Sequence, residues 1–516
     1  MTTKGTTTEI GLDHASLAML ASVVFVEICF CIDYHQQRWE TMIAPLHQPA
    51  AKAGEAWVIQ SNGLGYYAWL RSVLVDGDWD FTNEFDEHNP LGQYVPPPTY
   101  QTPLGRRANQ WSVGPACLWA IAVVPLHFFL KLGEGTFFGW ATDGYSLPYQ
   151  LAVAAMTLLG TSVGLGFLYA VCRLFASPIS AALAVAWLTL GTTLFYFNAI
   201  EISLPHGPAA AVMACFVWYW VKSYGQSRHG RWLLVGVLLG IAALMRWQLA
   251  TYAVLPAGEA ALAGLHLCLK GELRKLIQPF GSLALAALGT MIAFTPQIVA
   301  WRCVYGNWLA LPIQGIRFHW LTPSLWDVLL SQDRSLFYWT PLALIAFLGL
   351  FLGVLRGLLR NSEARASVEP LILLFVGFLM QVYALAAMWG QGEYLTKTEN
   401  SAGVFLARSF GFRDLTESLV ILVPGLALLL DQIRAHRFQL IRPLAACLII
   451  WNLLLVEGYV SGELPQMSGA DFRTLLTKTA NVISNEPSML LLAFMGPVLI
   501  EMVLLADRWT AKRVDC

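Results

Sequence analysis

The chain has 516 residues, of which 56% are hydrophobic and 13% are charged, with a formal net charge of −1. A soluble protein of this size carries about 25% charged residues, so the composition indicates a membrane protein. Nothing in the charge distribution resembles the basic stripe that nucleic-acid binding requires, and that class of function is excluded.

Hydrophobic runs of about 17 to 25 residues, long enough to cross about 30 Å of hydrocarbon, recur along the whole sequence. The first run is expected to remain as an anchor, because it is long for a signal peptide and no small-residue cleavage site follows it. The nine cysteines have no paired spacing, which argues against a disulfide framework or a zinc site. We therefore predict an all-α polytopic membrane protein with a single transmembrane domain, 1–516, of about 12–13 spans. The predicted spans are 15–32, 149–171, 178–197, 207–222, 232–251, 253–269, 277–300, 337–355, 369–389, 415–431, 443–460 and 488–506.

Loop charges predict the orientation of these spans. Short loops rich in Lys and Arg stay in the cytoplasm, and the basic clusters between spans all fall on one side if the spans alternate. The long loops 33–111, 301–336 and 390–414 are then extracytoplasmic. The apolar segment 112–131 would invert this order if it crossed, so we interpret it as re-entrant or interfacial. The basic clusters are Lys222/Arg228/Arg231, Lys270/Arg274/Lys275, Arg356/Arg360/Arg365, Arg434/Arg437/Arg442 and Arg508/Lys512/Arg513.

The first outer loop, 33–111, contains nine acidic and five basic residues. Residues 63–75 have helical periodicity and predict a short amphipathic helix on the membrane face, and an acidic run follows. Three interpretations of the run compete: a solvated acidic turn, a calcium loop with EF-hand-like spacing but Phe81 at the glycine position, and a source of a catalytic general base. The acidic residues of the run are Asp76, Asp78, Asp80, Glu84, Asp86 and Glu87.

Cations are predicted at the level of the outer loops. Arg246 lies 15 residues after Arg231, which places it roughly 22 Å above the cytoplasmic face if the helix is continuous. A charge inside a span is a functional hypothesis by default, although a structural ion pair between Arg246 and Glu259 of the next span is an equal alternative. Arginine side chains suit phosphate oxygens.

Several motifs in this order resemble the C-superfamily (GT-C) of membrane glycosyltransferases, which includes the protein O-mannosyltransferases and the lipid A aminoarabinose transferases. The motifs are "GLGYYAWLRSVLVDGDWDFTNEF", "NQWSVGPACLW", "EISLPHGPAA", "LMRWQ" and a late "FGFR". The resemblance implies a GT-C-like helical bundle with a large first outer loop that bears interfacial helices, and a sugar donor linked to polyprenyl phosphate. It implies inversion at the anomeric carbon and no cofactor besides this co-substrate, and it leaves a divalent metal open.

The resemblance also implies a set of site residues. One departure from the pattern is Asn62, which stands where an acidic residue is expected before Gly-Leu-Gly-Tyr-Tyr, and an amide cannot accept a proton as a carboxylate does. The base is then sought among Asp78 and Glu84 first, and Asp76 and Asp80 next. The expected donor-phosphate ligands are Arg246, Arg317, Arg413 and Arg107, and the expected substrate-binding residues are Asn62, Tyr66, Tyr67, Glu201 and His206.

The sequence thus predicts an inverting glycosyltransferase of the inner (plasma) membrane that works at the extracytoplasmic face. Its partners would be membrane lipids, a lipid-linked sugar donor and an acceptor that the sequence does not identify. Two alternatives stay open: a transporter or flippase of lipid-linked or anionic substrates, and a catalytically inactive membrane scaffold. Transporters usually have internal repeats and broken helices near the midplane, and we find no repeat between the two halves of the sequence.

Overall fold

The computed structural model describes residues 13–38, 40, 58–60, 62–89, 100–133, 140–310, 318–359, 368–389, 409–434, 438–464, 470–485 and 487–514. Within these residues the chain is built from helices, which confirms the predicted all-α class. The longer helices are α1 (His14–Arg38), α3 (Gly114–Leu132), α4 (Leu147–Arg173), α5 (Pro178–Leu190), α7 (His206–Lys222), α8 (His229–Met245), α9 (Val254–Leu269), α10 (Ile277–Tyr305), α13 (Pro341–Leu359), α15 (Glu369–Trp389), α17 (Leu419–Arg434), α18 (Phe438–Val460), α19 (Phe472–Asn485) and α20 (Pro487–Val514). The short helices are α2 (Gly63–Arg71), α6 (Thr193–Ala199), α11 (Leu325–Leu329) and α12 (Leu336–Trp339).

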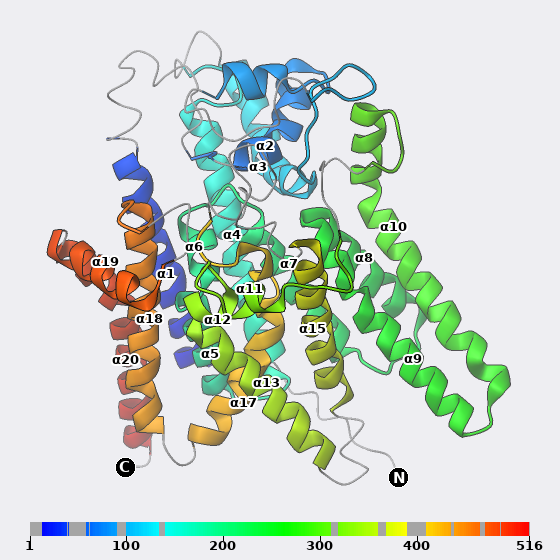
Figure 1. Cartoon of the computed structure of the whole chain (residues 1–516), viewed down its shortest axis with the longest axis vertical. Helices are drawn as coiled ribbons and strands as arrows, with labels where there is room; N and C mark the ends of the chain where they lie inside the picture. The colour runs from blue at the N-terminus through cyan, green and yellow to red at the C-terminus, as the bar shows by residue number, and fades with distance from the viewer. Residues whose placement is uncertain are drawn as a thin grey trace.

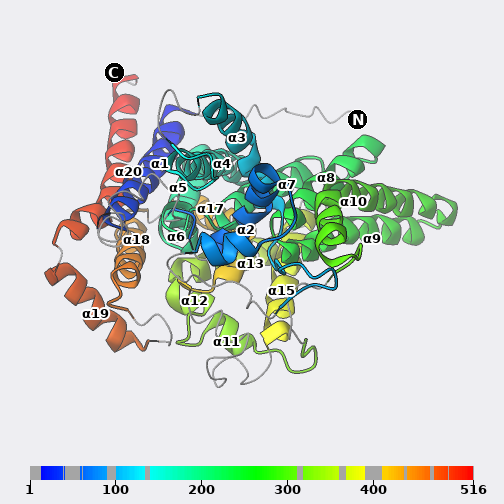
Figure 2. The ribbon, with the colours of Figure 1, turned by 90° about the horizontal axis from the view of Figure 1, so that it is seen from above.

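The long helices form an elongated bundle (Figure 1). Helices α1, α18 and α20 lie along one side, and the hairpin of α9 and α10 forms the other. Helix α2 and the first outer loop lie beyond one end of the bundle, which we call the α2 end (Figure 1). Helix α19 projects sideways from α18 and α20, as the view from above also shows (Figure 2).

Each predicted span coincides with a helix, but some of these helices are short or interrupted. Among the described residues, nine helices are long and apolar enough to cross a membrane, or up to ten if the bent pair α5 and α6 is one span. The count is lower than the predicted 12–13 because α7, α8 and α17 have only 17, 17 and 16 residues. Helices α5 and α6 meet at 72°, and α8 ends at Met245, directly before Arg246.

Glycines allow the two helices beside the α8 terminus to pack closely. A Cβ atom on Gly236 of α8 would lie 1.9 Å from the carbonyl oxygen of Ala286 of α10, and one on Gly289 of α10 would lie 2.3 Å from the Leu233 oxygen. Such separations leave no room for any side chain. The two backbones therefore fix the position at which α8 ends.

Helix α3 is a continuous helix rather than a re-entrant loop, and it runs antiparallel to α4. Its indole Trp119 Nε1 donates to Thr157 Oγ1 (3.0 Å), and its His127 Nδ1 lies 2.7 Å from Tyr149 Oη near the start of α4. The first turn of α7 packs lower on α4, since a Cβ on Gly207 would lie 2.6 Å from Thr161 Cγ2. Tyr149 precedes Thr161 by 12 residues of α4, so it lies about 18 Å farther along the helix axis than the contact between α7 and α4. Helix α3 passes the length and composition test for a span, and it extends away from the start of α7, toward the α2 end.

Candidate functional site

Helix α2 sits close to two other segments because glycines occupy its first turn. A Cβ on Gly63 would lie 2.2 Å from Ser203 Oγ, and one on Gly65 would lie 1.9 Å from the Trp111 ring. This close approach explains the glycines of the Gly-Leu-Gly-Tyr-Tyr motif. It also points the two tyrosines of the motif into different surroundings: Tyr67 donates to the carbonyl oxygen of Gly144 (2.6 Å), and Tyr66 lies within electrostatic range of Arg246.

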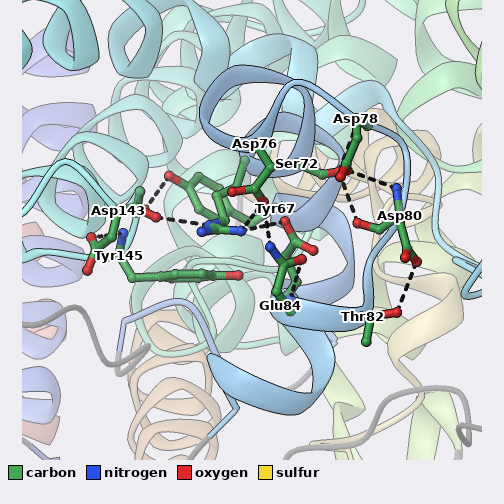
Figure 3. Close-up of polar contacts among 12 residues, drawn as sticks. Tyr67, Ser72, Asp76, Asp78, Asp80, Thr82, Glu84, Asp143 and Tyr145 are labelled. Atoms are coloured by element: carbon green, nitrogen blue, oxygen red, sulfur yellow. Dashed lines mark hydrogen bonds and ion pairs between the residues drawn. The ribbon is translucent and has the colours of Figure 1, made fainter.

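The first polar cluster gathers around Arg71 at the end of α2 (Figure 3). Its Nη1 donates to Glu84 Oε1 (2.9 Å) and to the Asp76 carboxylate, and its Nε donates to the Asp143 carbonyl (2.9 Å). The guanidinium also lies over the Tyr145 ring, 5.6 Å from its centroid. Burial raises the pKa of the Glu84 carboxyl to about 8, against the opposing effect of Arg71. Glu84 is fully buried, and its Oε2 has no hydrogen-bond partner among the described residues.

Asp78 and Asp80 hold the turn that follows α2. The Ser72 hydroxyl donates to Asp78 Oδ1 (2.8 Å), which also accepts from the Asp80 backbone N–H (3.0 Å). Asp80 Oδ1 in turn accepts from the Thr82 hydroxyl (3.0 Å) (Figure 3). It also accepts from the Arg107 backbone N–H (3.2 Å). Within the described residues, His, Cys, Asp and Glu side chains form no group of three that could hold a metal ion. The carboxylates of Asp78 and Asp80 stabilise the turn in which they lie.

Arg107, an expected phosphate ligand, belongs to the same region. Its Nη1 lies 2.7 Å from Asp86 Oδ2, and its guanidinium lies over the Phe85 ring, 5.8 Å from the centroid. The side chain is nearly buried, with 4% of its surface exposed. Arg107 therefore ties residues 100–113 to the acidic turn.

The second polar cluster gathers around Arg246, where α8 ends. The Arg246 backbone is extended (φ −148°, ψ 121°), and its guanidinium meets residues from two other segments. Nη2 donates to Asp414 Oδ1 (2.6 Å), Nη1 lies 2.8 Å from the His206 ring nitrogens, and Nε lies 3.3 Å from Glu417 Oε1. His206 Nδ1 is also 2.8 Å from Glu417 Oε1. We call Arg246, His206, Asp414 and Glu417 the Arg246 cluster.

The members of the Arg246 cluster differ in burial. His206 and Glu417 lie at the back, with 2% and 0% exposure, and the Phe197 ring covers His206 at a centroid distance of 4.1 Å. Arg246 and Asp414 are partly accessible, and Arg413, whose Nε lies 4.0 Å from Asp414 Oδ1, is more so. The accessible side of the cluster thus presents two guanidinium groups and a carboxylate.

Two neighbours extend this cluster. Burial raises the pKa of the Tyr66 phenol, and the positive charges of Arg246 and Arg413 oppose this increase. Burial also raises the pKa of Glu201, and here the opposing groups are Arg413 and a hydrogen bond from Tyr196. Tyr66, Glu201, His206, Arg246 and Arg413, all expected site residues, therefore come together.

The alternative pairing of Arg246 with Glu259 is wrong. Glu259 forms a two-pronged ion pair with Arg231 at the start of α8, with both N–O distances at 2.8 Å. Residues 247–253 form a 3-10 helix, which at about 2.0 Å per residue carries the chain roughly 14 Å before α9 begins. The chain therefore turns back toward the start of α8 directly after Arg246. By Glu259 it has returned to the height of Arg231.

The expected acids and arginines lie in two clusters rather than one. Among the described residues, the first-loop carboxylates form hydrogen bonds and ion pairs with residues 71–107, whereas Arg246 forms them with α7 and the segment before α17. Helix α2 connects the clusters through Tyr66 and Arg71. Asn62 lies one turn before Tyr66, whose N–H donates to the Asn62 carbonyl (3.3 Å). Arg317 lies outside the described residues.

Asp414 and Glu417 were missed by the sequence reasoning. Their signal is the string Arg413-Asp414-Leu-Thr-Glu417, two acids three residues apart ahead of an apolar run. Arg334 was missed as well: it is buried, has a left-handed backbone (φ 65°), and its Nη1 donates to the Ser409 carbonyl (2.6 Å). It thereby holds the segment that carries Asp414.

Comparison with known proteins gives matches at the level of structure alone. No protein-family model matches the sequence, and no curated protein matches it. The chain is similar to the structure of ArnT from Cupriavidus metallidurans bound to undecaprenyl phosphate, with 11% identity and a TM-score of 0.44, over 95% of this chain and 77% of that one. It is also similar to the apo oligosaccharyltransferase of Archaeoglobus fulgidus, with 11% identity and a TM-score of 0.40. This match covers 93% of the present chain, which spans only 56% of the oligosaccharyltransferase.

A further match is AglB from Archaeoglobus fulgidus in complex with an inhibitory peptide and a dolichol-phosphate, at 10% identity, a TM-score of 0.40, and coverage of 94% and 56%. At this identity the likeness concerns the path of the chain and says nothing about its side chains.

Proposed function

We propose that the protein is an inverting glycosyltransferase that moves a sugar from a polyprenyl-phosphate donor to an acceptor at the extracytoplasmic face of the membrane. The observation that carries the proposal is the Arg246 cluster. It combines a guanidinium group with carboxylates where a span ends, and its accessible side includes a second guanidinium, that of Arg413.

The depth of the cluster suits a lipid-linked phosphate. Helix α8 runs from Arg231 to Met245 without a break, so Arg246 lies roughly 22 Å from the level of Arg231, in the outer part of a hydrocarbon layer about 30 Å thick. A donor with its isoprenoid chain among the helices would bring its phosphate to this depth. Arginine N–H groups bind phosphate oxygens, and Arg413 together with the N–H groups of Arg246 that Glu417, His206 and Asp414 do not engage would supply such donors, with Arg107 and Arg317 as further candidates.

The arginine side chains are needed when the bond between the sugar and the phosphate breaks. The acceptor oxygen attacks the anomeric carbon, and the bond from that carbon to the phosphate oxygen breaks, with its electron pair leaving on the polyprenyl phosphate. Cations placed where this negative charge develops stabilise the transition state. A single displacement inverts the anomeric centre. Tyr66, Tyr67, Asn62, Glu201 and His206 would line or support the substrate site, and a carboxylate would take the acceptor proton.

The test uses the full chain in proteoliposomes with radiolabelled hexosyl and pentosyl polyprenyl phosphates. Release of polyprenyl phosphate from the donor is measured with cell-envelope extract as the source of acceptor, alongside donor affinity. Arg246→Ala is expected to lower release by about 10²–10³-fold, the usual cost of losing one preorganised donor to a developing charge. Arg302→Ala, which removes an exposed arginine of α10, is the matched control and is expected to leave release unchanged.

The same vesicles separate the alternatives. A flippase would move labelled donor between leaflets without cleaving it, and this movement would depend on Arg246. A scaffold would give neither cleavage nor movement. Absence of cleavage for every donor with the wild-type chain would contradict the proposed activity.

A further inference from the structure

We infer that Asp414 is the catalytic base of the proposed sugar transfer, a role that the sequence analysis assigned to the acids of the first outer loop. This inference rests on the proposed function. It starts from where a base has to lie once the donor phosphate is held by Arg246 and Arg413.

Inverting displacement fixes the position of the base relative to the phosphate. The leaving oxygen is bonded to the anomeric carbon, the attacking oxygen approaches that carbon from the opposite side at about 3–3.5 Å, and the base lies about 2.6–3.2 Å from the attacking oxygen. The base is thus roughly 7 Å from the leaving oxygen. A carboxylate in contact with the phosphate-binding arginine fits this spacing. Asp414 makes such a contact, since its Oδ1 lies 2.6 Å from Arg246 Nη2.

Asp414 also has an oxygen that is free to accept a proton. Its Oδ1 accepts from Arg246, whereas its Oδ2 makes no hydrogen bond within the described part of the chain. The residue is 7% exposed, so it reaches the accessible side of the cluster. Glu417, the other carboxylate of the cluster, is fully buried, and its Oε1 is engaged by His206 and Arg246. His206 and Glu417 are therefore positioning residues that hold Arg246 from behind.

The first-loop acids are arranged differently. Asp76 and Glu84 share Arg71, and Asp78 accepts from Ser72 and from the Asp80 backbone. Their hydrogen bonds stabilise the turn itself. Glu84 Oε2 has no hydrogen-bond partner among the described residues, but it is fully buried beside Arg71, in the cluster that is separate from Arg246. Asp414 is already next to it. The balanced step is that the acceptor hydroxyl proton moves to Asp414 Oδ2 as the acceptor oxygen bonds to the anomeric carbon and the phosphate leaves.

The experiment compares release rate and donor affinity. Asp414→Asn is the sharpest variant, because the amide oxygen still accepts from Arg246 while the group can no longer take a proton. We expect release to fall by about 10²–10⁴-fold, the usual contribution of a general base, with donor affinity within about threefold of wild type. In Asp414→Ala, added formate is expected to restore part of the rate, since a small carboxylate can occupy the vacated space. Glu272→Gln, at an exposed acid paired with Lys275 on the loop between α9 and α10, is the charge-matched control.

The possible results distinguish a failure of the assignment of Asp414 from a failure of the proposed glycosyltransferase function. If Asp414 only orients Arg246, Asp414→Asn will weaken donor affinity and rate together, formate will not help, and the inference is overturned. It is equally overturned if Asp78→Asn or Glu84→Gln, rather than Asp414→Asn, abolishes release with donor affinity intact. If Asp414→Asn has a much lower melting temperature than wild type, Asp414→Glu replaces it in the experiment. We expect this variant to retain donor affinity and to release polyprenyl phosphate more slowly than wild type. A wild-type chain that cleaves no donor contradicts the proposed function instead.

Discussion

Arg246 is held by three side chains from two distant segments, and this arrangement determines what it can do. His206 and Glu417 fix its Nη1 and Nε from the buried side, while Asp414 contacts Nη2 on the accessible side. A buried cation without such partners would be expensive. The pairing keeps the guanidinium charged and oriented, and preorganised charge is what a reaction that releases phosphate requires.

Glu84 gives a prediction about the pH dependence of stability. Burial raises the pKa of its carboxyl to about 8, so the folded chain favours the protonated form. A group whose pKa is higher in the folded state adds stability that is complete below its unfolded pKa and is lost as pH rises through the folded pKa. We expect the melting temperature of the purified protein to fall as the pH rises from about 4.5 to about 8.

The matched variant for this prediction is Glu84→Gln, which keeps the shape of the side chain and cannot ionise. Its melting temperature should change less over the same pH interval than that of the wild type. An equal decrease in both proteins would mean that another group controls the loss of stability.

At the scale of elements, the end of α8 depends on how closely α8 and α10 pack. Gly236 and Gly289 let the backbones touch, and this contact fixes the height at which Arg246 leaves the helix. We predict that Gly236→Val destabilises the protein by about 1–3 kcal/mol, the usual cost of overpacking, because the side chain would meet the Ala286 backbone. Thermal unfolding in detergent measures the loss.

Gly230→Ala is the control for this prediction, since a Cβ at Gly230 of α8 meets nothing within 4 Å. It should leave the melting temperature nearly unchanged. If Gly236→Val were equally harmless, the close packing of α8 and α10 would be refuted.

Helix interruptions are a second feature at this scale. The chain bends by 72° between α5 and α6 and leaves the α-helical conformation at Arg246. The pattern of apolar residues predicted continuous spans at both places, because hydrophobicity alone does not reveal where a helix ends. Both interruptions lie beside the Arg246 cluster, since Phe197 of α6 packs on His206.

At the scale of the whole molecule, the two ends of the bundle differ in chemistry. The α2 end carries the acidic turn and the Arg246 cluster, and the opposite end carries basic loops such as that of Lys270, Arg274 and Lys275. Basic loops stay in the cytoplasm. We therefore expect the α2 end to face the extracytoplasmic side.

Epitope insertion tests this orientation. Gly105 at the α2 end and Gly271 at the other end have positive φ angles of 73°, and neither has an atom within 4 Å of a built Cβ. A short tag after Gly105 should bind antibody on intact spheroplasts, and a tag after Gly271 should bind it only after permeabilisation. The reverse pattern would place the Arg246 cluster in the cytoplasmic leaflet and contradict the proposed site of transfer.

The sequence by itself determined the fold class and the position of most spans, because lipid imposes long apolar runs whose meaning is local. It also singled out Arg246, since a charge within a span is conspicuous without any knowledge of its partner. Glu201, His206 and Arg413 were singled out by the resemblance of their motifs to the GT-C glycosyltransferases. Only the tertiary structure decided which charges meet. Pairing depends on the height at which each helix ends, and a seven-residue 3-10 helix was enough to move Glu259 from Arg246 to Arg231. The same dependence left Asp414 unnoticed in the sequence and separated it, together with Arg246, from the acids of the first outer loop.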